Sequence, residues 1–315
     1  MNAIQHLAGL TAPLFLLVLV GYALSRWGGW PKAASEALTR FVFGVAIPAF
    51  LFRLMSDFAK LPHVDPRLLV AFFGGCVVVF VLGRAIARGM FGQDGVQQSV
   101  FGVASVFSNT VLLGVPMAQV TLPAAAMPSF SLVIVFNSLL LWTLVTISVE
   151  WARHRDFSLA GFGKTAKSVV LNPVIAGILA GTAWGFTGWQ LPGILDRTLV
   201  LIGDSAVPMS LIALGMGLAE YGIRAGWRQS TAIAALKLLA HPLAVYALAR
   251  ILALPPHETM AVTLLAALPV GANVYLMARQ FGALEGTIAS SLVVTTVLSA
   301  LTTPIVLALI GAGTR

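Results

Sequence analysis

Long apolar runs, separated by short polar stretches, follow one another along the whole chain. Each run is continuous rather than alternating, which indicates helices and excludes the strands of a membrane barrel. A helix that crosses a bilayer needs about 20 mostly apolar residues, and ten runs approach or exceed that length. We expect helices at residues 7–25, 35–55, 67–89, 96–120, 127–150, 168–188, 193–219, 228–253, 259–280 and 286–311.

The composition agrees with a chain that lies mostly in lipid. Of the 315 residues, 58% are hydrophobic and only 10% are charged, whereas soluble domains carry about 25% charged residues. The net charge of +8 is spread in ones and twos between the apolar runs. That spacing is typical of membrane-protein loops and not of a nucleic-acid-binding surface, so no nucleic-acid partner is expected.

A weak internal repeat appears when the chain is shifted by 160 residues against itself. Five helices per half is an odd number, so the second half would enter the bilayer the opposite way up. The sequence therefore predicts an all-α integral membrane protein with an inverted repeat of five plus five helices. The first repeat would span residues 1–150, the linker 151–167 and the second repeat 168–315. The matched pairs include Pro13 with Pro173, Gly21 with Gly181, Pro48 with Pro208 and Leu51 with Leu211.

The basic residues predict which way the helices run. Of the 19 Lys and Arg residues, 12 fall in the odd-numbered loops and 6 on the opposite side, while Lys237 lies within a helix. Because positive loops stay in the cytoplasm, the linker 151–167 should be cytoplasmic. Both termini should then lie on the other side of a bacterial inner membrane.

The fourth and ninth predicted helices contain residues that lipid does not tolerate easily. Helix breaks and polar side chains are accepted in a bilayer only where they face protein or a water-filled cavity. Such breaks in corresponding places of two repeats point to a transporter's binding site, and exposed helix N-termini there favour an anion such as a carboxylate. Two proline-kinked packing helices are the alternative. The residues are Ser108, Asn109, Thr110, Gly114 and Pro116 in the fourth helix, and Pro269, Gly271 and Asn273 in the ninth.

Other polar residues within the helices have two interpretations each. Asn137 and Trp142 in the fifth helix can face a substrate, or make an interhelical hydrogen bond and an interfacial anchor. Asp204 and Lys237 are charges within helices and can couple or gate transport, or serve the structure alone. Arg53 and Asp57, one turn apart, are expected to form a local ion pair.

Enzyme chemistry is not indicated. The chain contains no nucleophile elbow, no zinc-protease motif and no phosphate-binding lysine loop, and its single cysteine and scattered histidines do not match a metal site. We therefore expect neither a cofactor nor a metal.

Several segments resemble the auxin efflux carrier family in the order in which the family has them. They are "SNTVLLGVPM", "NPVIAGILAG", "GDSAVPMSLIALGMGL", "ALKLLAHPL" and "ALPVGANVYLMARQFG". The resemblance implies ten helices, with helices 4 and 9 crossing at their breaks. Helices 1, 2, 6 and 7 would form a scaffold that makes a homodimer, and helices 3–5 and 8–10 a moving transport part. It also implies alternating access of the elevator type for a small organic anion, auxin in plants and dicarboxylates in bacteria.

The resemblance also suggests individual roles. Asn109 matches the family's substrate-contacting Asn, Asn137 and Trp142 stand where plant members have Gln and Tyr, and Leu51 takes the place of a substrate-facing Ser. Ser108 and Val270 depart from the family motifs, and Asn273 adds an amide near the second departure, which puts auxin itself in doubt. The alternatives are an ion-coupled symporter of the bile-acid or sodium–proton exchanger architecture and a membrane receptor without transport.

Overall fold

The protein is helical throughout the part that the structure describes. This computed structural model describes residues 3–56, 65–154, 173–220 and 226–310. Within these residues the only strand-like pairing is one isolated bridge, so the expectation of an all-α protein is confirmed. Seven helical stretches are long and apolar enough to cross a membrane: Gln5–Arg26, Lys32–Ser56, Arg67–Phe91, Ala124–Arg153, Gly193–Leu218, Trp227–Ile251 and Glu285–Leu309.

The first half of the chain begins with three long helical stretches. Helix α1 (Ala3–Arg26) is followed by α2 (Lys32–Phe41), which continues through a π-helical turn into α3 (Ile47–Ser56), and then by α4 (Arg67–Phe91). The expected helix 35–55 thus begins three residues earlier, at Lys32. The rest of this half consists of α5 (Gly95–Ala104), α6 (Val115–Thr121) and α7 (Met127–His154). The part of the linker beyond 154 lies outside the described residues.

The second half contains α9 (Pro173–Phe186), α10 (Gly193–Asp204) and α11 (Ala206–Leu218). It continues with α12 (Trp227–Ala235), α13 (His241–Ile251), α14 (Pro256–Ala267), α15 (Asn273–Phe281) and α16 (Glu285–Leu309). Two expected helices, 96–120 and 259–280, are each divided in two by a non-helical segment. Of the expected helix 168–188, residues 168–172 lie outside the described residues, and α9 covers Pro173–Phe186.

Three helices widen into a π-helical turn immediately before a proline. The turns span Val42–Ala46, Thr110–Gly114 and Leu236–Ala240, and each ends two residues before Pro48, Pro116 or Pro242. Proline lacks the N–H that a helix needs, and its ring collides with the carbonyl four residues earlier. A local π-turn relieves that collision without ending the helix. A π-helical turn before a proline therefore occurs on both sides of the site described below.

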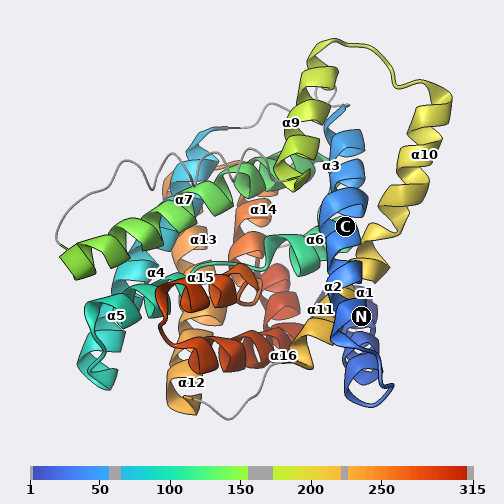
Figure 1. Cartoon of the computed structure of the whole chain (residues 1–315). Coiled ribbons are helices and arrows are strands. Elements are labelled where there is room, and N and C mark those ends of the chain that lie inside the picture. Colours follow the sequence, from blue (N-terminus) through green and yellow to red (C-terminus); the bar gives the residue numbers. More distant parts are fainter. Residues whose placement is uncertain (1–2, 57–64, 155–172, 221–225, 311–315) are drawn as a thin grey trace.

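The helices pack in two groups that lie beside each other (Figure 1). In one group α1 runs along α11 and α3 along α9, with α10 at the outer edge against α3. In the other group α4 packs against α13 and α5, and α16 packs against α12 and α14. Contacts of α1 with α16 and α6, and of α11 with the turn Thr110–Gly114, join the two groups.

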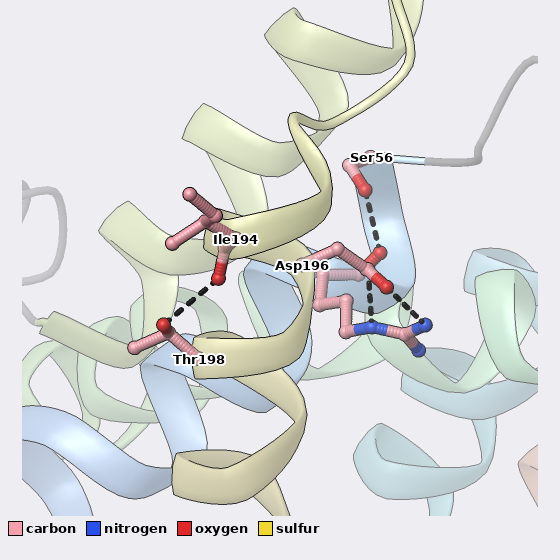
Figure 2. Close-up of polar contacts among 5 residues, drawn as sticks. Ser56, Ile194, Asp196 and Thr198 are labelled. Atoms are coloured by element: carbon pink, nitrogen blue, oxygen red, sulfur yellow. Dashed lines mark hydrogen bonds and ion pairs between the residues drawn. The ribbon is translucent and has the colours of Figure 1, made fainter.

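An ion pair fastens α10 to α3 at one end of the first group. The Arg53 guanidinium donates from Nε to Asp196 Oδ1 at 2.7 Å and from Nη2 to Oδ2 at 3.3 Å. Figure 2 shows Asp196 on α10 facing the helix end that carries Ser56, whose hydroxyl donates to the Arg53 carbonyl at 2.7 Å. The local pair expected with Asp57 lies outside the described residues. Among the described residues, Arg53 joins two helices through a partner that is 143 residues away in sequence.

Candidate functional site at the meeting of two interrupted helices

Two extended segments meet where α5 and α14 end. Residues 105–109 join α5 to the turn Thr110–Gly114, and residues 268–272 join α14 to α15. Ser108 and Val270 form an antiparallel bridge. On either side of it, the Asn109 N–H donates to the Pro269 carbonyl and the Gly271 N–H to the Phe107 carbonyl, both at 2.9 Å.

Glycines allow the two segments to come this close. A Cβ atom at Gly271 would lie 2.8 Å from the Ser108 carbonyl oxygen, and one at Gly114 would lie 2.8 Å from Cδ1 of Leu268. A larger residue at Gly271 would therefore force the two segments apart, and one at Gly114 would displace the Leu268 side chain. Leu268 itself is extended, as expected for a residue before Pro269. The structure thus brings together the Pro, Gly and Asn residues on which the sequence argument rested.

Side chains from neighbouring helices satisfy the backbone groups that the end of α14 leaves free. The last carbonyls of a helix have no partner within it. Lys237 Nζ donates to the Ala266 carbonyl at 2.7 Å, and Thr303 Oγ1 donates to the Ala267 carbonyl at 3.2 Å. Thr295 Oγ1 accepts the Val270 N–H at 3.1 Å. A lysine at the carboxyl end of a helix also complements the helix dipole.

Lys237 belongs to a fully buried cluster that includes His241 and Cys76. The Lys237 ammonium lies 3.1 Å from His241 Nδ1, and the other ring nitrogen, Nε2, lies 3.3 Å from the Cys76 sulfur. All three side chains are fully buried. Asp204, by contrast, is exposed at the last position of α10, and within the described residues no hydrogen bond or ion pair joins it to Lys237.

Some buried amide and hydroxyl groups at the crossing and on α7 lack a partner. Among the described residues, Asn109 Nδ2 and Ser108 Oγ have no hydrogen-bond partner, and neither has either amide atom of Asn137, although the three residues are at most 5% exposed. Because about 90% of buried polar groups are satisfied in folded proteins, by protein or by ordered water, such groups call for a partner beyond the described residues. Water is one such partner, and a substrate is another.

A cavity of about 810 Å³ reaches the meeting point from one side. Thr110 and Asn273, the first residues of the helical segments on either side of the bridge, line it together with Ile134 of α7. Farther out the wall carries the cations Lys32, Arg40 and Arg279 and the anions Glu36 and Glu220. The volume falls within the ~300–1,000 Å³ range of small-molecule sites.

The other residues expected at the site do not line this cavity. Asn137 lies one turn from Ile134 on α7 and is buried. Trp142, on the same helix, packs partly buried against the apolar core. Leu51 is fully buried in the core on α3. These three side chains, and that of Asn109, are therefore not part of the cavity wall that carries Thr110 and Asn273.

Comparison with known proteins identifies the family. The sequence profile of the family described as "Membrane transport protein" matches residues 7–307. The chain belongs to the membrane transport protein family. Its resemblance to the auxin efflux carriers is thereby confirmed, and so is the expectation of a multi-pass membrane transporter that is not an enzyme.

Named relatives share about a quarter of their residues with this transporter. A Rhizobium meliloti protein named "Putative malonate transporter" is 27% identical, covering 98% of this chain and 97% of its own length. "Auxin efflux carrier component 8" of Arabidopsis thaliana is 22% identical over 88% of this chain and 90% of its own. An "Uncharacterized transporter" of Methanothermobacter thermautotrophicus is 25% identical over 93% and 94%.

Several residues of the cavity and its surroundings were not predictable as site residues from the sequence of this transporter. Lys32, Arg40 and Arg279 were counted only as topology signals, although the polar positions 32, 35, 36, 39 and 40 have helical spacing that indicates one polar face. His241 and Cys76 carried no such signal. Their partners are distant in sequence, so only the packing of α4 against α13 reveals the cluster.

Proposed function

We propose that this transporter is a secondary carrier of a small organic anion, a mono- or dicarboxylate, in a bacterial inner membrane. The observation that carries the proposal is the unpaired, buried amide of Asn109 at the bridge between residues 105–109 and 268–272. The cavity lined by the adjoining Thr110 and by Asn273 gives a small molecule access to this place.

Several features of the site favour an anion. Helical segments begin at Thr110 and at Asn273, and the N-terminal end of a helix attracts negative charge. Among the described residues, Asn109 Nδ2 is a donor without an acceptor. Lys32, Arg40 and Arg279 line the cavity that leads to it. The name of the Rhizobium meliloti relative agrees with a carboxylate. In this proposal Asn109, Thr110 and Asn273 bind the anion, Asn137 lies behind them, and Leu51 and Trp142 are left out.

The same proposal includes ten membrane-crossing segments arranged as an inverted repeat, with α5–α6 and α14–α15 each crossing as an interrupted helix. Close helix contacts support the repeat. Gly21 on α1 lies against the backbone of Ile212 on α11, and Gly181 on α9 lies against the backbone of Phe52 on α3. Adding the offset of 160 to Gly21 gives Gly181, and subtracting it from Ile212 gives Phe52, so the offset converts the first contact into the second. A two-fold relation between the halves requires this exchange.

The position of the bridge supports the repeat independently. When two related halves pair in antiparallel fashion, the centre of the pairing lies where a residue of one half is opposite its own counterpart in the other half. The numbers of these two residues must differ by the repeat offset. The Ser108–Val270 pairing places Asn109 opposite Pro269, and these two residues are 160 apart. The offset taken from Gly21, Pro48 and their matches thus locates the centre of the crossing without reference to the structure.

We further propose that the two groups of helices move against each other. The group of α1, α2, α3, α9, α10 and α11 would be the scaffold and the homodimer interface. The group of α4–α7 and α12–α16 would carry the site across the membrane in an elevator-type movement. The cavity lies between the groups, lined by α2 and α11 on one wall and α15 and α16 on the other, as alternating access requires.

A binding measurement on three variants tests the site and the charge of its ligand. We expect Asn109→Ala to weaken the binding of a carboxylate by roughly tenfold to a hundredfold, because a hydrogen bond to a charged group contributes about 1.5–3 kcal/mol. Asn109→Asp should be weaker still, since it places a negative charge beside the anion. Gln190→Ala, at an exposed position far along the chain, serves as the control.

Calorimetric titration of the purified protein with a panel of mono- and dicarboxylates measures these affinities. If Asn109→Asp binds more tightly than Asn109→Ala, the ligand is not an anion. If both variants bind like the native protein, the site lies elsewhere.

A further inference from the structure

The ion pair between α3 and α10 occupies the place that the repeat relates to the cavity wall. Glu36 lines the cavity, and its counterpart at the offset of 160 is Asp196. Ala213 also lines the cavity, and its counterpart is Arg53. Arg53 and Asp196 form the ion pair that joins α3 to α10 (Figure 2). Both members of this pair are therefore counterparts of residues that line the cavity.

The helices around the two places pack in corresponding ways. At the cavity α2 packs against α11, and at the ion pair α10, the counterpart of α2, packs against α3, the counterpart of α11. Arg53 follows Lys32 by 21 residues within the stretch Lys32–Ser56. That separation corresponds to about 31 Å of helix, the thickness of a hydrocarbon core. The ion pair therefore lies at the membrane face opposite Lys32, which the charge pattern places outside the cytoplasm.

The two places differ in charge. Lys32, Arg40 and Arg279 line the cavity. The counterparts of these three cations are uncharged, namely Pro192, Val200 and Gln119. Among the counterparts of lining residues that the structure describes, Arg53 is the only Lys or Arg. An anion that enters from the outer face therefore finds its cation in Arg53.

Asp196 holds the guanidinium group in the way that a substrate carboxylate would. Arg53 donates from Nε to Asp196 Oδ1 at 2.7 Å and from Nη2 to Oδ2 at 3.3 Å, which is the paired geometry typical of arginine and a carboxylate. The side chains are 43% and 36% exposed, so solvent and ions reach them. An ion pair this exposed contributes little to the stability of the fold, and a second carboxylate can replace Asp196 at small cost.

We infer that Arg53 receives the anion at an outer entrance beside α3 and α10, and that Asp196 competes with the entering carboxylate for the guanidinium group. The inference rests on the proposed function, since it names a second binding site on the path of the same anion. Arg53 and Asp196 belong to the same group of helices, so exchanging Asp196 for the substrate requires no movement between the two groups.

The competing explanation is that the pair only fastens α10 to α3. Loss of either partner would then have the same effect, whereas competition predicts opposite effects of the two losses. Arg197 provides a matched control, because it is exposed on α10 directly after Asp196. Its counterpart Ala37 does not line the cavity.

Uptake of radiolabelled malonate into right-side-out and inverted membrane vesicles measures the two entrances separately. The first kind of vesicle presents the outer face to the labelled solution, and the second presents the cytoplasmic face. From the outer face, Arg53→Gln should raise the half-saturating concentration about fivefold, and Asp196→Asn should lower it about threefold. From the cytoplasmic face, both variants should match the native protein. Arg197→Gln should match it from both faces.

The double variant separates competition from a general effect of charge. If Asp196 acts by occupying Arg53, then Asp196→Asn should bring no gain in a protein that already carries Arg53→Gln, because no guanidinium group is left to release. A general attraction of anions would instead persist in the double variant.

The inference would be overturned by an unchanged Arg53→Gln protein, by changes of the same sign in Arg53→Gln and Asp196→Asn, or by an equal effect of Arg197→Gln. Changes that are as large from the cytoplasmic face, or a gain in the double variant, would also overturn it. In each of these cases, uptake that still depends on Asn109 would leave the proposed carboxylate carrier standing. If the native protein took up neither malonate nor any other carboxylate, the proposed function itself would be wrong.

Discussion

Lys237 shows how a charge can lie within a membrane helix without touching a substrate. It is fully buried, and its ammonium donates to the Ala266 carbonyl, one of the acceptors that the end of α14 leaves open. Lys237 therefore stabilises the break between α14 and α15 by binding a carbonyl at the end of α14. Its place beneath the crossing supports a positioning role for Lys237 and not direct substrate binding.

Substituting Lys237 by Met should reduce stability more than it alters the cavity. Met has a similar length but cannot donate, so the Ala266 carbonyl loses its partner at a cost of about 1–3 kcal/mol. Thermal unfolding of the detergent-purified protein should show a lower midpoint for Lys237→Met. Thr303→Val, which removes the longer bond to the Ala267 carbonyl, should show a smaller decrease. A midpoint for Lys237→Met at or above that of the native protein would contradict this role.

Single residues were predictable from the sequence where their own chemistry conflicts with a lipid environment. Asn109, Pro269 and Gly271 stood out because an amide, a proline and a glycine are unfavourable in a lipid-facing helix. The function of Lys237 was not predictable, because its acceptor is 29 residues away and exists only where α14 ends. Leu51 entered through family resemblance alone, and the structure places it in the core.

At the scale of elements, glycines determine how closely the helices of the two halves approach. Gly21 lets α1 approach the backbone of Ile212, and Gly181 lets α9 approach the backbone of Phe52. The apolar runs predicted both helices, and the 160-residue offset paired the two glycines. Which helices they contact could not be predicted, because that depends on packing across the two halves.

Replacing Gly21 or Gly181 by alanine should destabilise the folded protein to a similar degree. The added methyl group would overlap backbone atoms, which cannot move without displacing a whole helix, and overpacking of this kind costs about 1–3 kcal/mol. We expect Gly21→Ala and Gly181→Ala to lower the thermal midpoint by similar amounts. Gly9→Ala, on the same helix α1 but with open space around it, should have little effect. Equal midpoints for Gly21→Ala and Gly9→Ala would contradict the close packing.

The molecule as a whole has an orientation that the distribution of charges predicts. The cavity carries Lys32, Arg40 and Arg279, all of which belong to the side of the membrane that is expected to face the cytoplasm. If that orientation is correct, the cavity opens to the cytoplasm, and this structure represents an inward-facing state. The sequence predicted the sidedness from charge alone, but it did not predict which residues form the cavity, because that depends on how the two groups of helices meet.

Single cysteines introduced into a Cys76→Ala protein test the orientation. Gln280, near the end of α15, and Gln190, between α9 and α10, are both exposed and are expected on opposite sides of the membrane. An impermeant maleimide added to intact cells should label Gln190→Cys rapidly and Gln280→Cys only after the membrane is opened. The reverse pattern would invert the proposed topology and turn the cavity to the outside.

Transport through the crossing is the central claim, and flux by the purified protein in liposomes tests it most directly. Vesicles preloaded with an unlabelled carboxylate should accumulate the same radiolabelled carboxylate from outside for at least one member of a panel that includes malonate. With Asn109→Ala, accumulation should fall to about a tenth or less, in line with a lost hydrogen bond of about 1.5–3 kcal/mol to a charged group. Accumulation of no carboxylate by the native protein, or undiminished accumulation with Asn109→Ala, would contradict the account.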